Sequence, residues 1–381
     1  MSKVAVKYDL ITWARERSGL RTDALVKKFP KFREWERGEV QPTLRQLESL
    51  AKATSTPLGY FFLPEPPEDR LPIPDFRTLP GAQPRRPSPN LLETIQTMQQ
   101  RQGWMRDFLI EQGQEALEFV GSVGLQGDSN DVAAGMRAAL SLPNDWARQE
   151  STWTEALRTL REATEGAGIL VVINGIVGNN TRRKLDRNEF QGFVLADEYA
   201  PLIFINGADF KAAQMFTLAH ELAHLWLGRG GVINFEEMQP VNNEVELFCN
   251  RAAAEFLVPA AELRATWQEA QESDEPFQFL ARHFKVSPIV AARRALDLQL
   301  MSRQDFFEFY REYQEDERRV KRTSSGGDFY ATQGTRIGER FANAVIRAVK
   351  EGRLLYRDAY RLTGLHGKTF DRYAEHLGFR R

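Results

Sequence analysis

The sequence of 381 residues contains a single cysteine, Cys249, and only five histidines. One cysteine cannot form an intrachain disulfide, and it cannot build a zinc site from several thiolates. A metal site in this chain must therefore use histidine and carboxylate side chains. The scarcity of cysteine also fits a reducing compartment, so we expect a cytoplasmic protein.

Long apolar runs are missing as well. No uninterrupted stretch approaches the roughly 18 residues that a membrane span needs, and no apolar signal segment follows the first lysines. The formal net charge of -1 produces no overall attraction to nucleic acid or to a membrane surface. We therefore expect no membrane partner, and any contact with DNA must come from a local basic patch.

The chain is too long for one ordinary core, and its patterns predict five regions of a mostly helical α+β protein. Short amphipathic helices predict a five-helix bundle at residues 1–63, and dense prolines predict an extended linker at 64–90. Helices followed by short strands predict the main core at 91–272. A helical pair at 273–301 and a basic helical region at 302–381 complete the chain. Thr43 in the bundle and Ser287 in the helical pair are the expected N-caps of helices.

The hydrophobic period changes before the most informative motif. Runs rich in β-branched residues occur at 168–173, 190–195 and 202–205. The polar connection between the last two runs has the length of a hairpin loop. The sequence therefore predicts a small sheet directly before a helix at residues 216–227.

That helix carries the sequence H-E-x-x-H. His220 and His224 are four residues apart, so both imidazoles project from one face of a helix and can reach one ion. The expected cofactor is Zn²⁺, because a catalytic zinc takes three protein ligands and leaves a fourth position for water. Glu221 is then the predicted general base that takes a proton from this water.

A carboxylate on the following helix, at about residues 244–257, should supply the third ligand. Glu246 is our choice, and Asn250 lies one turn later on the same face, where it can orient a ligand from behind. The residues alone leave four other glutamates open, namely Glu236, Glu237, Glu244 and Glu255.

These two helices resemble the ImmA/IrrE family of metallo-endopeptidases. That family pairs F-T-L-A-H-E-L-A-H with a later helix of the form E-x-x-[AC]-N-x-x-A-A-E-x-L-x-P, and both forms occur here. Segments 189–193 and 202–206 are also similar to strands of the family. The resemblance, over about residues 168–300, implies a zincin-like core with Glu246 as the third zinc ligand. It also implies cleavage of a helix-turn-helix repressor, often the product of an adjacent gene.

The N-terminal bundle resembles an Xre-type helix-turn-helix domain at residues 35–43. It departs from that family at residues 21–34, which are shorter than usual and place a proline where the recognition helix should begin. Lys31, Arg33 and Arg37 are the candidate DNA contacts, and a solvated basic face is the alternative. The helical pairs at about 279–294 and 356–377 are further candidates of the same kind. Packing against the core is the alternative for the first pair, and a solvated basic surface is the alternative for the second.

Substrate placement follows from the order of strand, loop and metal helix. Zinc peptidases of this type commonly hold an extended chain against a neighbouring strand. The predicted platform is strand 202–206, with Phe204, Ile205 and Asn206 as substrate contacts. The alternative is that this strand is a buried core element.

The predicted function is a zinc-dependent endopeptidase that cleaves a protein substrate, with a DNA-binding repressor as the expected target. The resemblance places it in a stress-response, mobile-element or toxin–antitoxin context. The alternative is a DNA-binding transcriptional regulator or antitoxin that binds a partner through a peptidase-like domain without cutting it.

Overall fold

The computed structural model describes residues 3–74, 86–233, 243–315 and 329–379. Contacts divide the chain into two units, residues 1–72 with 83–96 and residues 73–82 with 97–381. The predicted α+β class is confirmed, because helices predominate and the strands form a small mixed sheet. Among the described residues, no helix has the length and apolar character that crossing a membrane requires.

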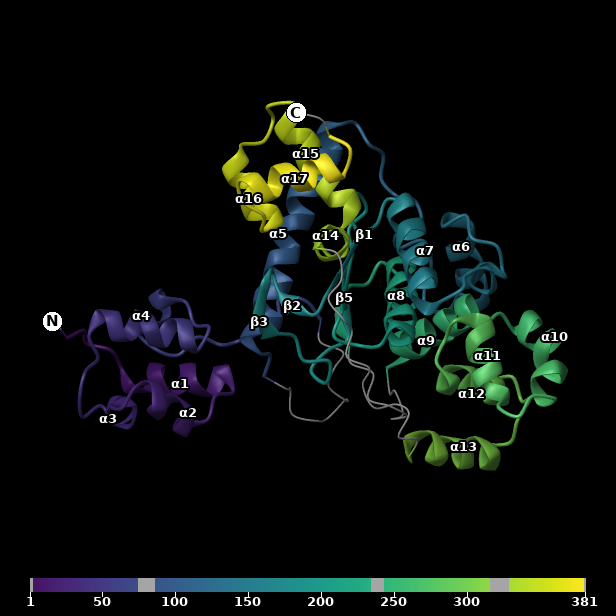
Figure 1. Cartoon of the computed structure of the whole chain (residues 1–381), viewed down its shortest axis with the longest axis horizontal. Coiled ribbons are helices and arrows are strands. Elements are labelled where there is room, and N and C mark those ends of the chain that lie inside the picture. Colours follow the sequence, from purple (N-terminus) through teal and green to yellow (C-terminus); the bar gives the residue numbers. More distant parts are fainter. Residues whose placement is uncertain (1–2, 75–85, 234–242, 316–328, 380–381) are drawn as a thin grey trace. The chain divides into compact units, whose positions relative to one another are not determined.

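The first unit contains a helical bundle (Figure 1). Its elements are α1 (Tyr8–Ser18), α2 (Thr22–Lys28), α3 (Phe32–Glu36), α4 (Leu44–Ala53) and the 3-10 helix η1 (Leu58–Phe62). Apolar side chains at helical spacing, including Leu10, Trp35 and Leu50, are buried together in its centre. Thr43 caps α4 as predicted, since its side chain accepts a hydrogen bond from the Gln46 amide at 3.4 Å.

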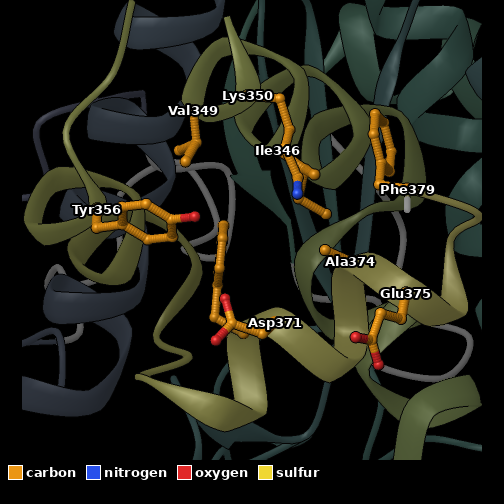
Figure 2. A pocket seen from close by; sticks show the side chains of 9 residues that line it. Ile346, Val349, Lys350, Tyr356, Asp371, Ala374, Glu375 and Phe379 are labelled. Carbon is orange, nitrogen blue, oxygen red and sulfur yellow. The ribbon is translucent and has the colours of Figure 1, made fainter. Parts of the chain in front are cut away.

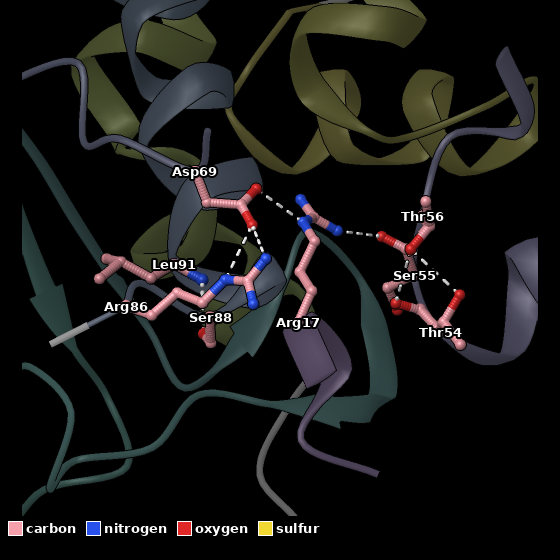
Figure 3. Close-up of polar contacts among 8 residues, drawn as sticks. All are labelled: Arg17, Thr54, Ser55, Thr56, Asp69, Arg86, Ser88 and Leu91. Atoms are coloured by element: carbon pink, nitrogen blue, oxygen red, sulfur yellow. Dashed lines mark hydrogen bonds and ion pairs between the residues drawn. The ribbon is translucent and has the colours of Figure 1, made fainter. Parts of the chain in front are cut away.

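The predicted linker is tied to this bundle by a buried ion pair (Figure 3). Residues 64–74 form no helix or strand, as their proline content predicts. However, Arg17 donates to one oxygen of Asp69 at 2.8 Å, and Arg86 donates to the other at 3.0 and 3.1 Å. The side chains of Arg17 and Asp69 are only 7% and 6% exposed. Asp69 and Arg86 of the predicted linker are therefore held in a hydrogen-bonded cluster with the bundle residue Arg17.

Helix α5 (Pro89–Glu111) begins two residues earlier than the boundary predicted from the sequence and continues from the first unit into the second. The other helices of the second unit before its sheet and metal motif are α6 (Ser129–Ala139), the 3-10 helix η2 (Trp146–Gln149) and α7 (Trp153–Gly166). Thr152 caps α7 by accepting from the Glu155 amide at 3.2 Å.

The sheet of the second unit has the strand order β1-β5-β4-β6. Its strands are β1 (Leu170–Asn174), β4 (Gly192–Leu195), β5 (Leu202–Asn206) and β6 (Gly231–Ile233). β1 is parallel to β5, whereas β4 is antiparallel to both β5 and β6. The three predicted strands are therefore present, and the antiparallel pairing of β4 with β5 agrees with the predicted hairpin. Three short strands were not predicted: β6, β2 (Ile176–Val177) and β3 (Asn180–Lys184).

One face of this sheet packs against α8 (Lys211–Trp226), which contacts β4 and β5. Figure 1 shows α8 beside β5. Side chains alternate along the strands, so Ile203 and Ile205 join the core around α8. Phe193 and Phe204 belong to the other set of positions, and their rings stack at 4.9 Å. β4 and β5, which precede α8 in sequence, therefore form the surface against which this helix packs.

Helices after the sheet complete the core. They are α9 (Glu244–Leu257), α10 (Ala260–Gln271), α11 (Pro276–Phe284), α12 (Pro288–Asp297) and α13 (Arg303–Glu315). Ser287 caps α12 as predicted by accepting from the Val290 amide at 3.3 Å. Leu280 and Ala291 lie in the same hydrophobic core as α8. The helical pair at 273–301 therefore packs on the core, which is the alternative that the sequence left open.

The C-terminal helices are α14 (Phe329–Ile337), α15 (Glu339–Lys350), α16 (Tyr356–Thr363) and α17 (Lys368–His376), and α14 packs against β1. Arg101 of α5 is buried and donates to the carbonyls of Leu362 and Arg336 at 2.9 and 3.2 Å. Burial lowers the pKa of Arg101 to about 10. Helices α15, α16 and α17 enclose a hollow of about 260 Å³, lined by apolar and charged side chains (Figure 2). The basic residues that open this region in sequence, Arg318, Arg319, Lys321 and Arg322, lie outside the described residues.

Candidate metal centre

Helix α8 places both motif histidines in the protein interior. The side chain of Gln214 donates to the carbonyls of Gly207 and Asp209 at 3.3 and 2.7 Å and so anchors the first turn of the helix. His220 and His224 lie about two and three turns further along, with 0% and 1% of their surface exposed. Their ring centroids are 4.8 Å apart. The four-residue spacing therefore brings both imidazoles to one point, as the helix period requires.

Helix α9 brings Glu246 to the same point, and residues outside the helix hold both of its ends. Asn243 caps it by accepting from the Val245 amide at 3.0 Å. Glu246 lies in the first turn, where the positive end of the helix dipole favours a carboxylate. At the other end, Arg137 and Arg294 donate to backbone carbonyls at 3.0 and 3.1 Å. This anchoring fixes the position of the carboxylate relative to α8.

Three side chains with potential ligand atoms converge between α8 and α9. Nε2 of His220 lies 3.0 Å from Nε2 of His224 and 3.0 Å from Oε2 of Glu246. Nε2 of His224 lies 3.2 Å from Oε1 of Glu246. Two ring nitrogens and a carboxylate thus face one another across a buried triangle.

This donor set fits zinc. Tetrahedral zinc with bonds of about 2.0 to 2.1 Å places its ligand atoms roughly 3.3 Å from one another. The observed separations of 3.0 to 3.2 Å differ from that spacing by only a few tenths of an ångström. Two imidazoles and one carboxylate are also the ligand set of many catalytic zinc sites.

Asn250 lies behind the first histidine, where the sequence placed it. Its Oδ1 is 3.0 Å from Nδ1 of His220. An amide oxygen can only accept, so this contact assigns the ring proton to Nδ1 and leaves the lone pair of Nε2 directed at the triangle. Such a contact orients a ligating histidine and makes it more basic.

The charges of the site are unusual for a protein interior. Burial alone would raise the pKa of Glu246, but the hydrogen bonds and charges of His220 and His224 outweigh burial and lower it. Burial lowers the pKa of His224, which favours the neutral imidazole that a metal needs. Glu246 is therefore ready to ligate as a carboxylate and His224 as a neutral ring.

Glu221 is fully buried beside this triangle. Within the part of the chain that the structure describes, neither of its carboxylate oxygens has a hydrogen-bond partner. Burial, and then the charge of Glu246, raise its pKa well above the ordinary value. A raised pKa is what a carboxylate needs to accept a proton from water near neutral pH, and a cation held by the neighbouring ligands would favour its ionised form.

Cys249 is a further donor near the histidines that the sequence analysis set aside. Its sulfur and one ring nitrogen from each of His220 and His224 lie within 4.8 Å of one another. The atoms of Glu246 are closer, at 3.0 and 3.2 Å, and burial raises the pKa of the Cys249 thiol well above its ordinary value. Glu246 is therefore the better third ligand. A signal for Cys249 was present, because it follows Glu246 by three residues on the same helix.

The other glutamates that the sequence left open do not join the site. Glu244 is exposed, and Glu255 forms an ion pair with Arg294. Glu236 and Glu237 lie outside the described residues.

The predicted substrate platform is wrong. β5 lies between β1 and β4, so both of its edges are paired within the sheet. Phe204, Ile205 and Asn206 are 1% exposed or less. The strand is the buried core element that was the alternative in the sequence analysis, because β1 pairs with one of its edges and β4 with the other.

The candidate nucleic-acid contacts lie on the surface of the N-terminal bundle. Arg33 pairs with Asp23 at 3.1 Å, and Arg37 pairs with Glu39 at 3.7 Å. Lys31 lines a hollow of about 540 Å³ together with Lys28, Arg45 and Trp35. Helix α3, where a recognition helix is expected, has only five residues, or about one and a half turns. Carboxylates thus partly neutralise the candidate basic face.

A comparison with protein families finds a match over the central part of the chain. Residues 164–296 match the Peptidase M78 family, described as an IrrE N-terminal-like domain. This match supports the resemblance to the ImmA/IrrE family there and indicates a domain of the metallopeptidase kind, a kind that typically uses zinc. Residues 337–376 match a domain of unknown function. No curated protein and no solved structure matches the chain.

Proposed function

We propose that this protein is a zinc-dependent endopeptidase that cleaves a protein substrate. The observation that carries the proposal is the convergence of His220, His224 and Glu246 at 3.0 to 3.2 Å, with the buried carboxylate of Glu221 beside them. A structural zinc site usually has four protein ligands, whereas three ligands and an adjacent base define a catalytic arrangement.

The residues then divide the work of peptide hydrolysis. His220, His224 and Glu246 would hold the zinc ion, and Asn250 keeps His220 in the required tautomer. Bound zinc supplies a Lewis acid that makes water nucleophilic near neutral pH. Glu221 accepts the proton of the attacking water and then delivers it to the leaving amine, which uses both protonation states of one carboxyl group.

The proposed substrate is a DNA-binding repressor encoded by an adjacent gene. Support comes from the similarity of the central domain to the ImmA/IrrE family, to which this mode of action belongs. The chemistry requires an extended peptide segment, so the target should be cut in an exposed loop more readily than within a helix.

The test is to incubate the purified, zinc-loaded protein with the product of the adjacent gene, in parallel with the variant Glu221→Gln. Because glutamine cannot accept the proton, we expect cleavage to fall by about 10² to 10⁴-fold in the variant. Zinc content should stay the same, since Glu221 is not a ligand. Equal cleavage by both proteins would remove Glu221 from the mechanism.

The second candidate is a transcriptional regulator or antitoxin that grips its partner without cutting it. Support comes from the hollow lined by Lys28, Lys31 and Arg45 in the N-terminal bundle, which suits an anionic partner such as DNA. The same incubation separates the two candidates. Tight binding of the adjacent product without any cleavage would favour the regulator.

A further inference from the structure

The sheet positions that face α8 show one break in their pattern. These positions carry aliphatic side chains that join the core around the helix: Val171, Ile173, Val194, Ile203 and Ile205. Gly192 occupies the remaining position on β4, two residues before Val194, and has no side chain. A glycine inside a buried strand weakens the strand unless something must approach its backbone closely.

The group that approaches Gly192 is the carboxylate of Glu221. A Cβ atom added to Gly192 would lie 2.9 Å from Oε1 of Glu221, 2.6 Å from Cγ2 of Thr217 and 3.0 Å from the Phe204 carbonyl oxygen. Side chains do not tolerate such distances without a shift of their neighbours. The backbone of Gly192 does not have a positive φ, so this position requires space rather than an unusual conformation.

The position of the Glu221 carboxylate depends on packing more than that of most buried polar groups. Neither oxygen of Glu221 has a hydrogen-bond partner among the described residues, so no such bond fixes the carboxylate. Gly192 itself is held from both sides, because it pairs with Ile205 of β5 and with Ile233 of β6. The strand therefore presents a rigid surface against which the side chain of Glu221 rests.

We infer that Gly192 is a positioning residue for Glu221: the missing side chain on β4 leaves the space in which the base lies beside the metal ligands. The catalytic meaning of this role rests on the proposed function. The steric coupling between Gly192 and Glu221 does not, and it can be measured without metal or substrate.

The first experiment is a double-mutant cycle on the metal-free full-length protein. We expect Gly192→Ala to lower the midpoint of thermal unfolding, and Glu221→Ala to recover a substantial part of that loss, because it removes one of the crowded atoms. Gly175→Ala is the matched control. Its added Cβ would crowd the Ala208 amide at 3.0 Å and has no contact with Glu221, so its effect should be the same in both backgrounds. Equal losses for Gly192→Ala with and without the Glu221 carboxylate would overturn the inference.

The second experiment tests the consequence for catalysis. Zinc-loaded Gly192→Ala should keep its zinc, since none of the crowded atoms belongs to a ligand, while kcat falls about 100-fold with little change in KM. Thr217→Ser removes the methyl group at 2.6 Å and should restore part of the lost kcat in the Gly192→Ala background. Unchanged kcat in a folded, zinc-loaded Gly192→Ala protein would contradict the positioning role. If the wild-type protein cleaves nothing, the proposed function fails, and the cycle above still decides the steric claim.

Discussion

The N-terminal bundle and the metal centre treat buried charge in opposite ways. In the bundle, the buried carboxylate of Asp69 accepts hydrogen bonds from both Arg17 and Arg86. At the metal centre, the buried carboxylate of Glu221 has no hydrogen-bond partner among the described residues, and its neighbour Glu246 is also acidic. The guanidinium groups of Arg17 and Arg86 offset the cost of burying the charge of Asp69, whereas no hydrogen bond offsets the cost of burying a charge on Glu221.

This difference separates a structural ion pair from a site of chemistry. Burial shifts an unpaired carboxyl such as that of Glu221 towards its neutral form, and its pKa rises. Perturbed groups of this kind gather at functional sites. This difference favours the triangle of His220, His224 and Glu246 as the functional site and the Asp69 cluster as a structural ion pair.

The largest expected effect is loss of metal. The double variant His220→Ala/His224→Ala removes two of three ligands, so we expect zinc to fall from about one per chain to nearly none. Elemental analysis of the purified protein measures this. The bundle should remain folded, because its core is separate from the histidines, as circular dichroism can verify. Stoichiometric zinc in the double variant would exclude the site.

A smaller but still large loss of stability should follow from removing the ion pair between Arg17 and Asp69. Asp69→Ala leaves the guanidinium of Arg17 buried without its carboxylate, which costs about 3 to 5 kcal/mol for a buried pair. Hydrogen exchange of the bundle amides, together with urea unfolding, measures the loss. Glu39→Ala is the control, because its pair with Arg37 is exposed and should contribute less than about 1 kcal/mol. Equal losses of stability for the two substitutions would show that the buried Asp69 pair stabilises the bundle no more than an exposed pair does.

A third buried carboxyl predicts a pH dependence. Burial is the main cause that raises the pKa of Glu165 from 4.5 to about 7, although Arg161 opposes the shift. The folded state therefore holds a proton that the unfolded state releases, so this group favours folding at low pH, and its contribution is lost as pH rises from 4.5 through 7. The loss should not exceed about 3.4 kcal/mol. Glu165→Gln stays neutral and should flatten the decline in stability between pH 5 and 8, measured by urea unfolding. An unchanged slope would contradict the shifted pKa.

The smallest expected effect concerns DNA. Carboxylates pair with Arg33 and Arg37, and α3 is short, so we expect the full chain to bind duplex DNA only weakly, at about 10⁻⁴ to 10⁻⁶ M. Binding should weaken further between 50 and 200 mM salt in a fluorescence anisotropy titration. Lys31→Ala should reduce it only slightly. Nanomolar, sequence-selective binding at physiological salt would overturn this expectation.

Local patterns accounted for much of the candidate site. The four-residue spacing of His220 and His224 depends only on the helix period, so it could be predicted without the fold. Glu246 and Asn250 were reached from their spacing on one helix and from the resemblance to a family. The caps Thr43 and Ser287 were likewise predicted, because a cap bonds to an amide three residues away.

Other features depend on which distant segments meet. β6 has three residues, too few for a visible alternation. The parallel pairing of β1 with β5 and the antiparallel pairing of β4 with β5 leave β5 inside the sheet. Asp69 lies 52 residues from Arg17, and the hydrogen bond between them holds part of a proline-rich segment against the bundle. The sequence by itself predicted the helices, the two candidate metal-binding histidines and the candidate base, since these follow from neighbours within one or two turns. The preference for Glu246 over the other glutamates needed the resemblance to a family. Only the tertiary structure decided the strand order and the opposition of Gly192 to Glu221, because both depend on how buried surfaces from remote segments pack together.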